Sequence, residues 1–253
     1  MGRENSILWM ECVFTRDGAG SMEYRIEKID GVCCRMWIHG QGGPAIYWGT
    51  AYDGAECTEH VAGIMADKLG DQPWMLVAYE MKNWNQSYSP WALPSVMGTD
   101  EFTGGAKETL AWLTDIGIPA IEENLQYRVS SRMLGGYSLS GLFSLFAFYE
   151  SRMFDGVASC SGSLWYPGWK EYSEGQKAPK GSCVYLSLGR KEEKTRNRKM
   201  SIVGEMTRWQ YDQVQCDRNV HASELTWHNG GHFAVVDHRI AQGFIWLIGH
   251  TRG

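Results

Sequence analysis

Short apolar runs alternate with amphipathic stretches along most of this 253-residue chain, and this alternation constrains the fold most strongly. Residues 74–80 (WMLVAYE) and 182–189 (SCVYLSLG) have the near-continuous apolar character of buried parallel strands. Further strand patterns cover 9–14, 23–29, 32–38, 132–138 and 222–228, and residues 156–163 (GVASCSGS) read as a short strand followed by a loop. Helical patterns cover 55–69, 104–126 (broken near Gly117 and Pro119), 139–151, 198–216 and 234–250. Strands that alternate with helices predict one α/β domain over residues 1–253, with a mostly parallel central sheet and helices on both faces.

Charge and composition exclude several classes of protein. The net charge is -5 and no basic stripe is present, so we expect no nucleic-acid partner. No apolar run reaches the length of a membrane span, and Glu4 and Glu11 interrupt any secretory signal, so we expect no membrane association. Seven cysteines without a C-x-x-C pair indicate neither a disulfide framework nor a metal site. We therefore expect a cytoplasmic protein without a bound metal, whose oligomeric state the sequence leaves open.

The most informative segment is GGYSLSG at 135–141, where a strand is expected to turn directly into a helix. A nucleophile elbow of the form G-x-S-x-G places its serine at the tip of such a turn, with small neighbours that allow the sharp bend. Gly136 and Ser138 fit this pattern, whereas Ser140 stands in place of the final glycine. We interpret Ser138 as a nucleophile. Ser140 is the weaker alternative, because it falls in the first helical turn.

A serine nucleophile needs a base and an acid, which follow it in this chain order on an elbow-containing sheet. After the last strand the chain reads WHNGGHF, and the two glycines before His232 allow its loop to bring the ring over the sheet edge. We favour His232 over His228, which ends the strand. The acid is expected after the strand at 182–189, where Glu192 and Glu193 are both available.

Two backbone N–H groups would stabilise a developing oxyanion. The residue after the nucleophile, Leu139, supplies one. The strand at 32–38 runs into the glycine-rich segment HGQGG, and we expect Gln41 of this loop to supply the other N–H.

The chain contains 12 tryptophans, an unusually high number. Trp37, Trp74 and Trp112 fall in predicted strands or helices and are expected in the core. Residues 81–101 lack periodicity, and an aperiodic loop of this length is usually functional. This loop and a second one around 165 carry the aromatic residues expected to bind substrate, which are Trp84, Tyr88, Trp91, Trp165 and Tyr166.

Together these segments resemble the esterase D-type branch of the α/β-hydrolase superfamily, which includes feruloyl esterases and enterochelin-type siderophore esterases. The resemblance spans most of the chain and rests on 38–43 (IHGQGG), 88–91 (YSPW), 136–141 (GYSLSG), 159–165 (SCSGSLW) and 230–233 (GGHF). In such enzymes the acid commonly lies three residues after a strand-ending glycine, which from Gly189 selects Glu192. Ser140 and the segment NQS at 85–87 depart from the family pattern.

The resemblance implies an α/β-hydrolase fold and a serine esterase that forms an acyl-enzyme on a small-molecule ester, without a cofactor. The aromatic loops indicate a bulky or aromatic ester. Three alternatives remain open at this point. They are hydrolysis of a siderophore trilactone, acyl transfer to an acceptor alcohol at the same site, and ligand binding without catalysis.

Overall fold

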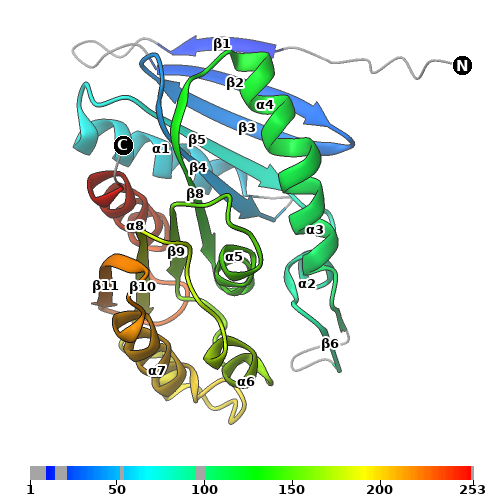
Figure 1. Ribbon diagram of the computed structural model, residues 1–253, viewed down its shortest axis with the longest axis vertical. Coiled ribbons are helices and arrows are strands. Elements are labelled where there is room, and N and C mark those ends of the chain that lie inside the picture. The colour runs from blue at the N-terminus through cyan, green and yellow to red at the C-terminus, as the bar shows by residue number, and fades with distance from the viewer. Residues whose placement is uncertain (1–9, 15–21, 52–53, 95–100, 252–253) are drawn as a thin grey trace, which may run out of the picture.

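The computed structural model describes residues 10–14, 22–51, 54–94 and 101–251. Its central feature is a nine-stranded sheet in the order β1-β2-β3-β5-β4-β8-β9-β10-β11 (Figure 1). The strands are β1 (Met10–Phe14), β2 (Met22–Ile29), β3 (Val32–His39), β4 (Gly43–Thr50), β5 (Trp74–Glu80), β8 (Val129–Tyr137), β9 (Gly156–Cys160), β10 (Ser182–Gly189) and β11 (Val220–His228). From β5 to β11 all neighbours pair in parallel, whereas β1, β2 and β3 pair antiparallel. The predicted mostly parallel sheet is therefore confirmed.

Helices cover both faces of this sheet. One face packs against α1 (Ala55–Leu69) and α8 (Val236–His250), which also contact each other. The other face packs against α5 (Leu139–Glu150), α3 (Ala106–Trp112), α4 (Ile118–Leu125) and α7 (Val203–Cys216). Figure 1 shows α3 and α4 as one rod alongside the sheet. The break expected near Gly117 and Pro119 is wrong, because a π-helical turn at Leu113–Gly117 joins α3 to α4 without interruption.

The sequence analysis missed β4, which lies in the middle of the sheet between β5 and β8. Its first residues, Gly43 and Pro44, resemble a turn, and Gly49 interrupts its apolar run. Both features have structural reasons. Proline is tolerated at the start of a strand. A side chain at Gly49 would place a Cβ atom 2.6 Å from the ring of Tyr88, so only glycine allows this close packing.

The loop expected at 81–101 contains short regular elements. These are α2 (Trp84–Tyr88) and β6 (Ala92–Leu93), which pairs with β7 (Phe102–Thr103). A further short helix, α6 (Trp169–Glu174), follows β9. Trp37, Trp74 and Trp112 are buried, so their predicted place in the core is confirmed.

Candidate active site

Ser138 lies at the turn between β8 and α5, where the sheet meets its covering helix. It adopts a φ of 59° and a ψ of -122°, a conformation that non-glycine residues rarely occupy. Two backbone bonds hold the turn, because the Ser138 N–H donates to the Cys160 carbonyl at 3.1 Å and its carbonyl accepts from Ser163 N–H at 2.9 Å. A Cβ atom at Gly136 would collide with the Ser140 backbone, so glycine is required there. This is the local geometry of the predicted elbow.

Ser140 replaces the usual elbow glycine without opening the turn. Its side chain is fully buried, and its Oγ both accepts from the Tyr137 N–H and donates to the Tyr137 carbonyl, at 3.0 Å each. The hydroxyl therefore ties the first turn of α5 to the end of β8. It points into the protein, so Ser140 is not the nucleophile in this arrangement.

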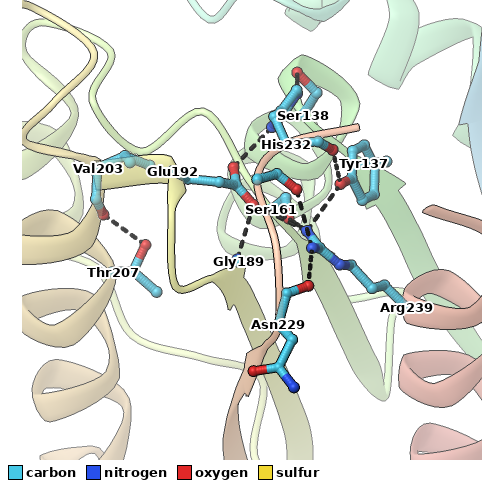
Figure 2. Close-up of polar contacts among 11 residues, drawn as sticks. Tyr137, Ser138, Ser161, Gly189, Glu192, Val203, Thr207, Asn229, His232 and Arg239 are labelled. Atoms are coloured by element: carbon cyan, nitrogen blue, oxygen red, sulfur yellow. Dashed lines mark hydrogen bonds and ion pairs between the residues drawn. The ribbon is translucent and has the colours of Figure 1, made fainter. Parts of the chain in front are cut away.

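His232 lies between Ser138 and Glu192. Its Nε2 is 3.0 Å from the Ser138 Oγ, and its Nδ1 is 2.7 Å from the Glu192 Oε2 (Figure 2). The three residues follow β8, β10 and β11, whose carboxyl ends meet at one edge because these strands run parallel. The structure therefore brings the three predicted side chains into one hydrogen-bonded chain.

The charge of Glu192 determines the roles of the two imidazole nitrogens. Burial raises the pKa of the Glu192 carboxyl, but hydrogen bonds from His232, Ser161 and the Gly189 N–H, together with the positive charge that His232 carries whenever its ring is protonated, outweigh burial and lower it below its ordinary value of 4.5. An ionised carboxylate only accepts hydrogen bonds, so His232 carries its proton on Nδ1. Nε2 is then free to accept the hydroxyl proton of Ser138.

The alternatives for base and acid lie elsewhere. Glu193 points away from the site and pairs with Arg208 at 3.0 Å, a half-exposed ion pair. His228 ends β11, and burial together with the nearby charge of Arg239 lowers its pKa. Of the four candidates, Glu192 and His232 are therefore the two that hydrogen-bond to each other.

Two residues that the sequence analysis did not select complete the surroundings of Glu192. Its Oε1 accepts from Ser161 Oγ at 2.8 Å and from Arg239 Nη1 at 3.0 Å, in addition to the Gly189 N–H at 2.8 Å. Arg239 had a detectable signal, since it is a charged residue on the otherwise apolar buried face of α8. For Ser161, the sequence offers no signal other than its place in the segment SGS at 161–163.

The prediction for Gln41 is wrong. The loop that contains it follows β3, which runs antiparallel to β5, so it lies at the opposite edge of the sheet from Ser138. Gly43, two residues further on, pairs with Val129 at the start of β8, whereas Ser138 follows its end. The nine residues of β8 separate the two edges by about 26 Å. Leu139 begins α5 directly after Ser138, as expected.

The five predicted substrate-binding aromatics do gather, but they mostly pack against one another. The Tyr166 hydroxyl donates to the Trp91 carbonyl at 2.7 Å, and the Trp91 Nε1 donates to the Pro167 carbonyl at 2.9 Å, so the two loops are joined. Tyr88, Trp165 and Tyr166 are buried, which contradicts a role in contacting substrate in this conformation. Trp84 and Trp91 remain partly exposed.

Neither metal binding nor membrane insertion has support among the described residues. Within the described residues, no three His, Cys, Asp or Glu side chains gather closely enough to hold a metal ion. The helices of the described segments all lack the combined length and hydropathy needed to cross a bilayer. Phe233, directly after His232, is 91% exposed and stands edge-on to the imidazole ring, with centroids 5.0 Å apart. An exposed apolar ring therefore borders the candidate base.

Comparison with known proteins identifies the family. A sequence model of the family described as "Putative esterase" matches residues 35–236, which is most of the chain. The chain therefore belongs to this esterase family, and it is a hydrolase with an α/β-hydrolase fold. No curated protein sequence matches it significantly.

Solved structures share the fold at low sequence identity. The siderophore hydrolase EstA from Aspergillus nidulans has a TM-score of 0.69 and 16% identity, over 96% of this chain and 94% of that one. An IroE-like serine hydrolase from Shewanella oneidensis has a TM-score of 0.70 and 17% identity, over 96% and 80%. An S-formylglutathione hydrolase from Agrobacterium tumefaciens has a TM-score of 0.62 and 11% identity, over 97% and 99%.

The lowered pKa of Glu192 predicts a pH-dependent contribution to stability. Because the folded-state pKa lies below 4.5, the carboxylate stabilises the fold above this pH and loses that contribution as the pH falls through the folded-state value. We expect Glu192→Gln to lower the free energy of unfolding by about 1.5–3 kcal/mol at neutral pH, and by less as the pH decreases below 4.5. Urea unfolding at several pH values measures this difference.

Glu193→Gln is the matched control, because it removes a neighbouring carboxylate from a half-exposed ion pair. It should change the unfolding free energy by about 0–1 kcal/mol. A Glu192→Gln deficit that is independent of pH, or equal to that of Glu193→Gln, would contradict the interpretation.

Proposed function

We propose that this esterase hydrolyses a bulky or aromatic carboxylic ester through an acyl-enzyme on Ser138. His232 acts as the general base and acid, and Glu192 orients its imidazole. The observation that carries the proposal is the hydrogen-bonded chain from Ser138 Oγ through both nitrogens of His232 to Glu192, with Ser138 at a strained turn.

The steps follow from this geometry. As Ser138 Oγ attacks the ester carbonyl carbon, His232 Nε2 takes its proton, and the imidazolium is stabilised by the Glu192 carboxylate. The bond to the leaving oxygen breaks when His232 returns that proton to it, which releases the alcohol. Water then attacks the acyl group, His232 takes the proton of water and delivers it to Ser138, and the carboxylic acid leaves.

The N–H groups of Leu139 and Ala51 are proposed to bind the oxyanion, with Ala51 replacing Gln41. Trp48 of β4 pairs with Gly135 of β8, and continuing this register places Ala51 beside Ser138. The orientation of the Ala51 N–H follows from its peptide. The Thr50 carbonyl accepts from the Tyr88 hydroxyl at 3.1 Å and from the Met81 N–H at 3.3 Å, on the β5 side. In a trans peptide the next N–H points the opposite way, toward β8.

The kinetic test compares substitutions in the triad with a neighbour outside it. Ser138→Ala and Glu192→Gln should each lower kcat/KM for p-nitrophenyl esters by about 10⁴-fold, since removing one member of such a unit disables it. Glu193→Gln should retain activity, because its carboxylate faces Arg208. Equal activity of the two glutamine variants would exclude Glu192 as the acid.

Tyr88→Phe tests the proposed oxyanion peptide. The substitution removes one of the two donors to the Thr50 carbonyl and leaves only the Met81 N–H, so the Ala51 N–H is held less firmly in its orientation. We expect kcat to fall by up to about 10²-fold with little change in KM, because the oxyanion forms only in the transition state. Tyr149→Phe, which removes a buried hydroxyl that accepts from Gln210 instead, is the control and should leave kcat unchanged. An unaltered kcat in Tyr88→Phe would argue against the assignment of Ala51.

The preference for a bulky or aromatic ester is supported by an exposed aromatic ring beside His232. Phe233 offers a nearly free ring directly after the base, and Trp84 and Trp91 are partly exposed. Aromatic pairing contributes about 0.5–1.5 kcal/mol per contact, or roughly 2- to 10-fold in affinity. Feruloyl esters should therefore have a lower KM than acetyl esters in wild type, and Phe233→Ala should reduce that difference.

Hydrolysis of a siderophore trilactone is the second candidate. It is supported by two proteins of the same fold, which are the siderophore hydrolases EstA and EstB from Aspergillus nidulans. The same site would open such a lactone by the steps above. Turnover of an enterobactin-like trilactone in preference to feruloyl and p-nitrophenyl esters would select this candidate, and the reverse preference would select the simpler ester. Product formation that depends on an added acceptor alcohol would instead indicate acyl transfer.

A further inference from the structure

Arg239 is a fully buried cation beneath the loop that carries His232. It lies in the first turn of α8, and its relative exposure is 0%. Burying a guanidinium is costly unless its donors find partners, and in Arg239 the two Nη atoms have them whereas Nε has none among the described residues. The partners of Arg239 therefore indicate what this cation does.

The guanidinium joins the acid of the triad to the loop of the base. Its Nη1 donates to Glu192 Oε1 at 3.0 Å, and its Nη2 donates to the backbone carbonyls of Asn229 at 3.1 Å and Gly231 at 3.0 Å (Figure 2). Gly231 directly precedes His232, and Asn229 lies three residues before it. The planar guanidinium group, with its two Nη donors arranged as a rigid fork, thus fixes the position of Glu192 relative to the loop of His232.

Further contacts connect this fork to the strand before the nucleophile. Arg239 Nη1 also lies 3.3 Å from the Tyr137 hydroxyl and 3.3 Å from Ser161 Oγ. The Tyr137 hydroxyl in turn donates to the His232 carbonyl. Gly189 leaves the required space, since a Cβ atom there would lie 2.8 Å from Glu192 Oε1 and 2.9 Å from Arg239 Nη1.

Stability alone does not account for a cation at this position. Buried ion pairs contribute little compared with well-packed apolar residues of similar size, and replacing them is often neutral or stabilising. Glu192 already has partners in His232, Ser161 and the Gly189 N–H. The charge and the fork geometry of Arg239 are therefore the features that need a functional explanation.

We propose that Arg239 is a positioning residue that sets the geometry between Glu192 and His232 and opposes protonation of the imidazole. The inference rests on the proposed acyl-enzyme mechanism. The hydrogen bonds from the guanidinium hold the loop of His232 at a fixed position relative to the Glu192 carboxylate. Its positive charge offsets part of the Glu192 charge, so that His232 remains neutral and able to accept the Ser138 proton.

Several titratable groups face this guanidinium from the surrounding elements. The charge of Arg239 acts on Tyr137 of β8, Cys160 of β9 and His228 of β11, and its guanidinium donates to Glu192 after β10. His232 directly follows Gly231, whose carbonyl accepts from the guanidinium. Burial raises the pKa of Tyr137 to about 12 and that of Cys160 to about 12, so neither changes charge at neutral pH. Glu192 stays ionised there. Removing the Arg239 charge would therefore leave the negative charge of the Glu192 carboxylate without a neighbouring cation, which favours the protonated form of His232.

The test compares Arg239→Lys, which keeps the charge and loses the fork, with the neutral variants Arg239→Gln and Arg239→Met. All three should lower kcat by about 10²-fold through misplacement of the triad, with little change in KM. Only the neutral variants should also shift the acidic limb of the pH dependence of kcat/KM toward higher pH.

Arg132→Gln is the control, because it breaks an ion pair with Glu122 at the far edge of the sheet. It should change neither kcat nor the acidic limb of the pH dependence.

Nuclear magnetic resonance of ¹⁵N-histidine follows the His232 ring independently of turnover, with His232→Asn providing the assignment. We expect the ring to protonate at higher pH in either neutral variant than in wild type or Arg239→Lys. Identical titrations in wild type and the neutral variants, or unchanged kcat in all three, would overturn the proposal while leaving the esterase mechanism intact. A wild type that cleaves no ester would instead contradict that mechanism, and the titration would still decide the role of Arg239.

Discussion

The strained turn at Ser138 determines the arrangement of the whole site. A non-glycine residue at a φ of 59° carries an energetic cost of about 1–3 kcal/mol, and it persists because the surrounding structure leaves no alternative. Gly136 allows the chain to pass against the first turn of α5, and the Ser140 hydroxyl closes that turn onto the end of β8. The serine that departs from the family pattern therefore strengthens the bend that the nucleophile needs.

Parallel pairing converts this one turn into a complete site. Since β4, β8, β9, β10 and β11 run in the same direction, the segments that follow them meet at one edge of the sheet. In the proposed mechanism these segments supply a backbone donor, a nucleophile, supporting hydrogen bonds, an acid and a base. A buried electrostatic network centred on Glu192 then fixes how the last two face each other.

The parts predicted correctly from sequence depend on local patterns. The elbow at Ser138, the glycines before His232 and the apolar runs of β5 and β10 are all read over a few neighbouring residues. The missed strand β4 shows the limit, because Pro44 and Gly49 have local signatures of a turn while their reasons are tertiary. Missing this strand moved the expected oxyanion loop to the wrong edge of the sheet and produced the error at Gln41.

The aromatic residues and Arg239 show the same limit for side chains. Sequence placed the two aromatic loops near the elbow, but only the packing shows that Tyr88, Trp165 and Tyr166 are buried against other rings. The role of Arg239 depends on residues 8 to 102 positions away, from Gly231 to Tyr137, and no local pattern encodes such a network.

The central claim is that Ser138 becomes covalently modified during turnover. Incubation of the protein with a fluorophosphonate, followed by mass spectrometry of its peptides, tests this most directly. The account predicts a single adduct on the peptide containing Ser138, located on that residue by fragmentation and absent in Ser138→Ala. Resistance of the wild type to labelling, or equal labelling of Ser138→Ala, would contradict it.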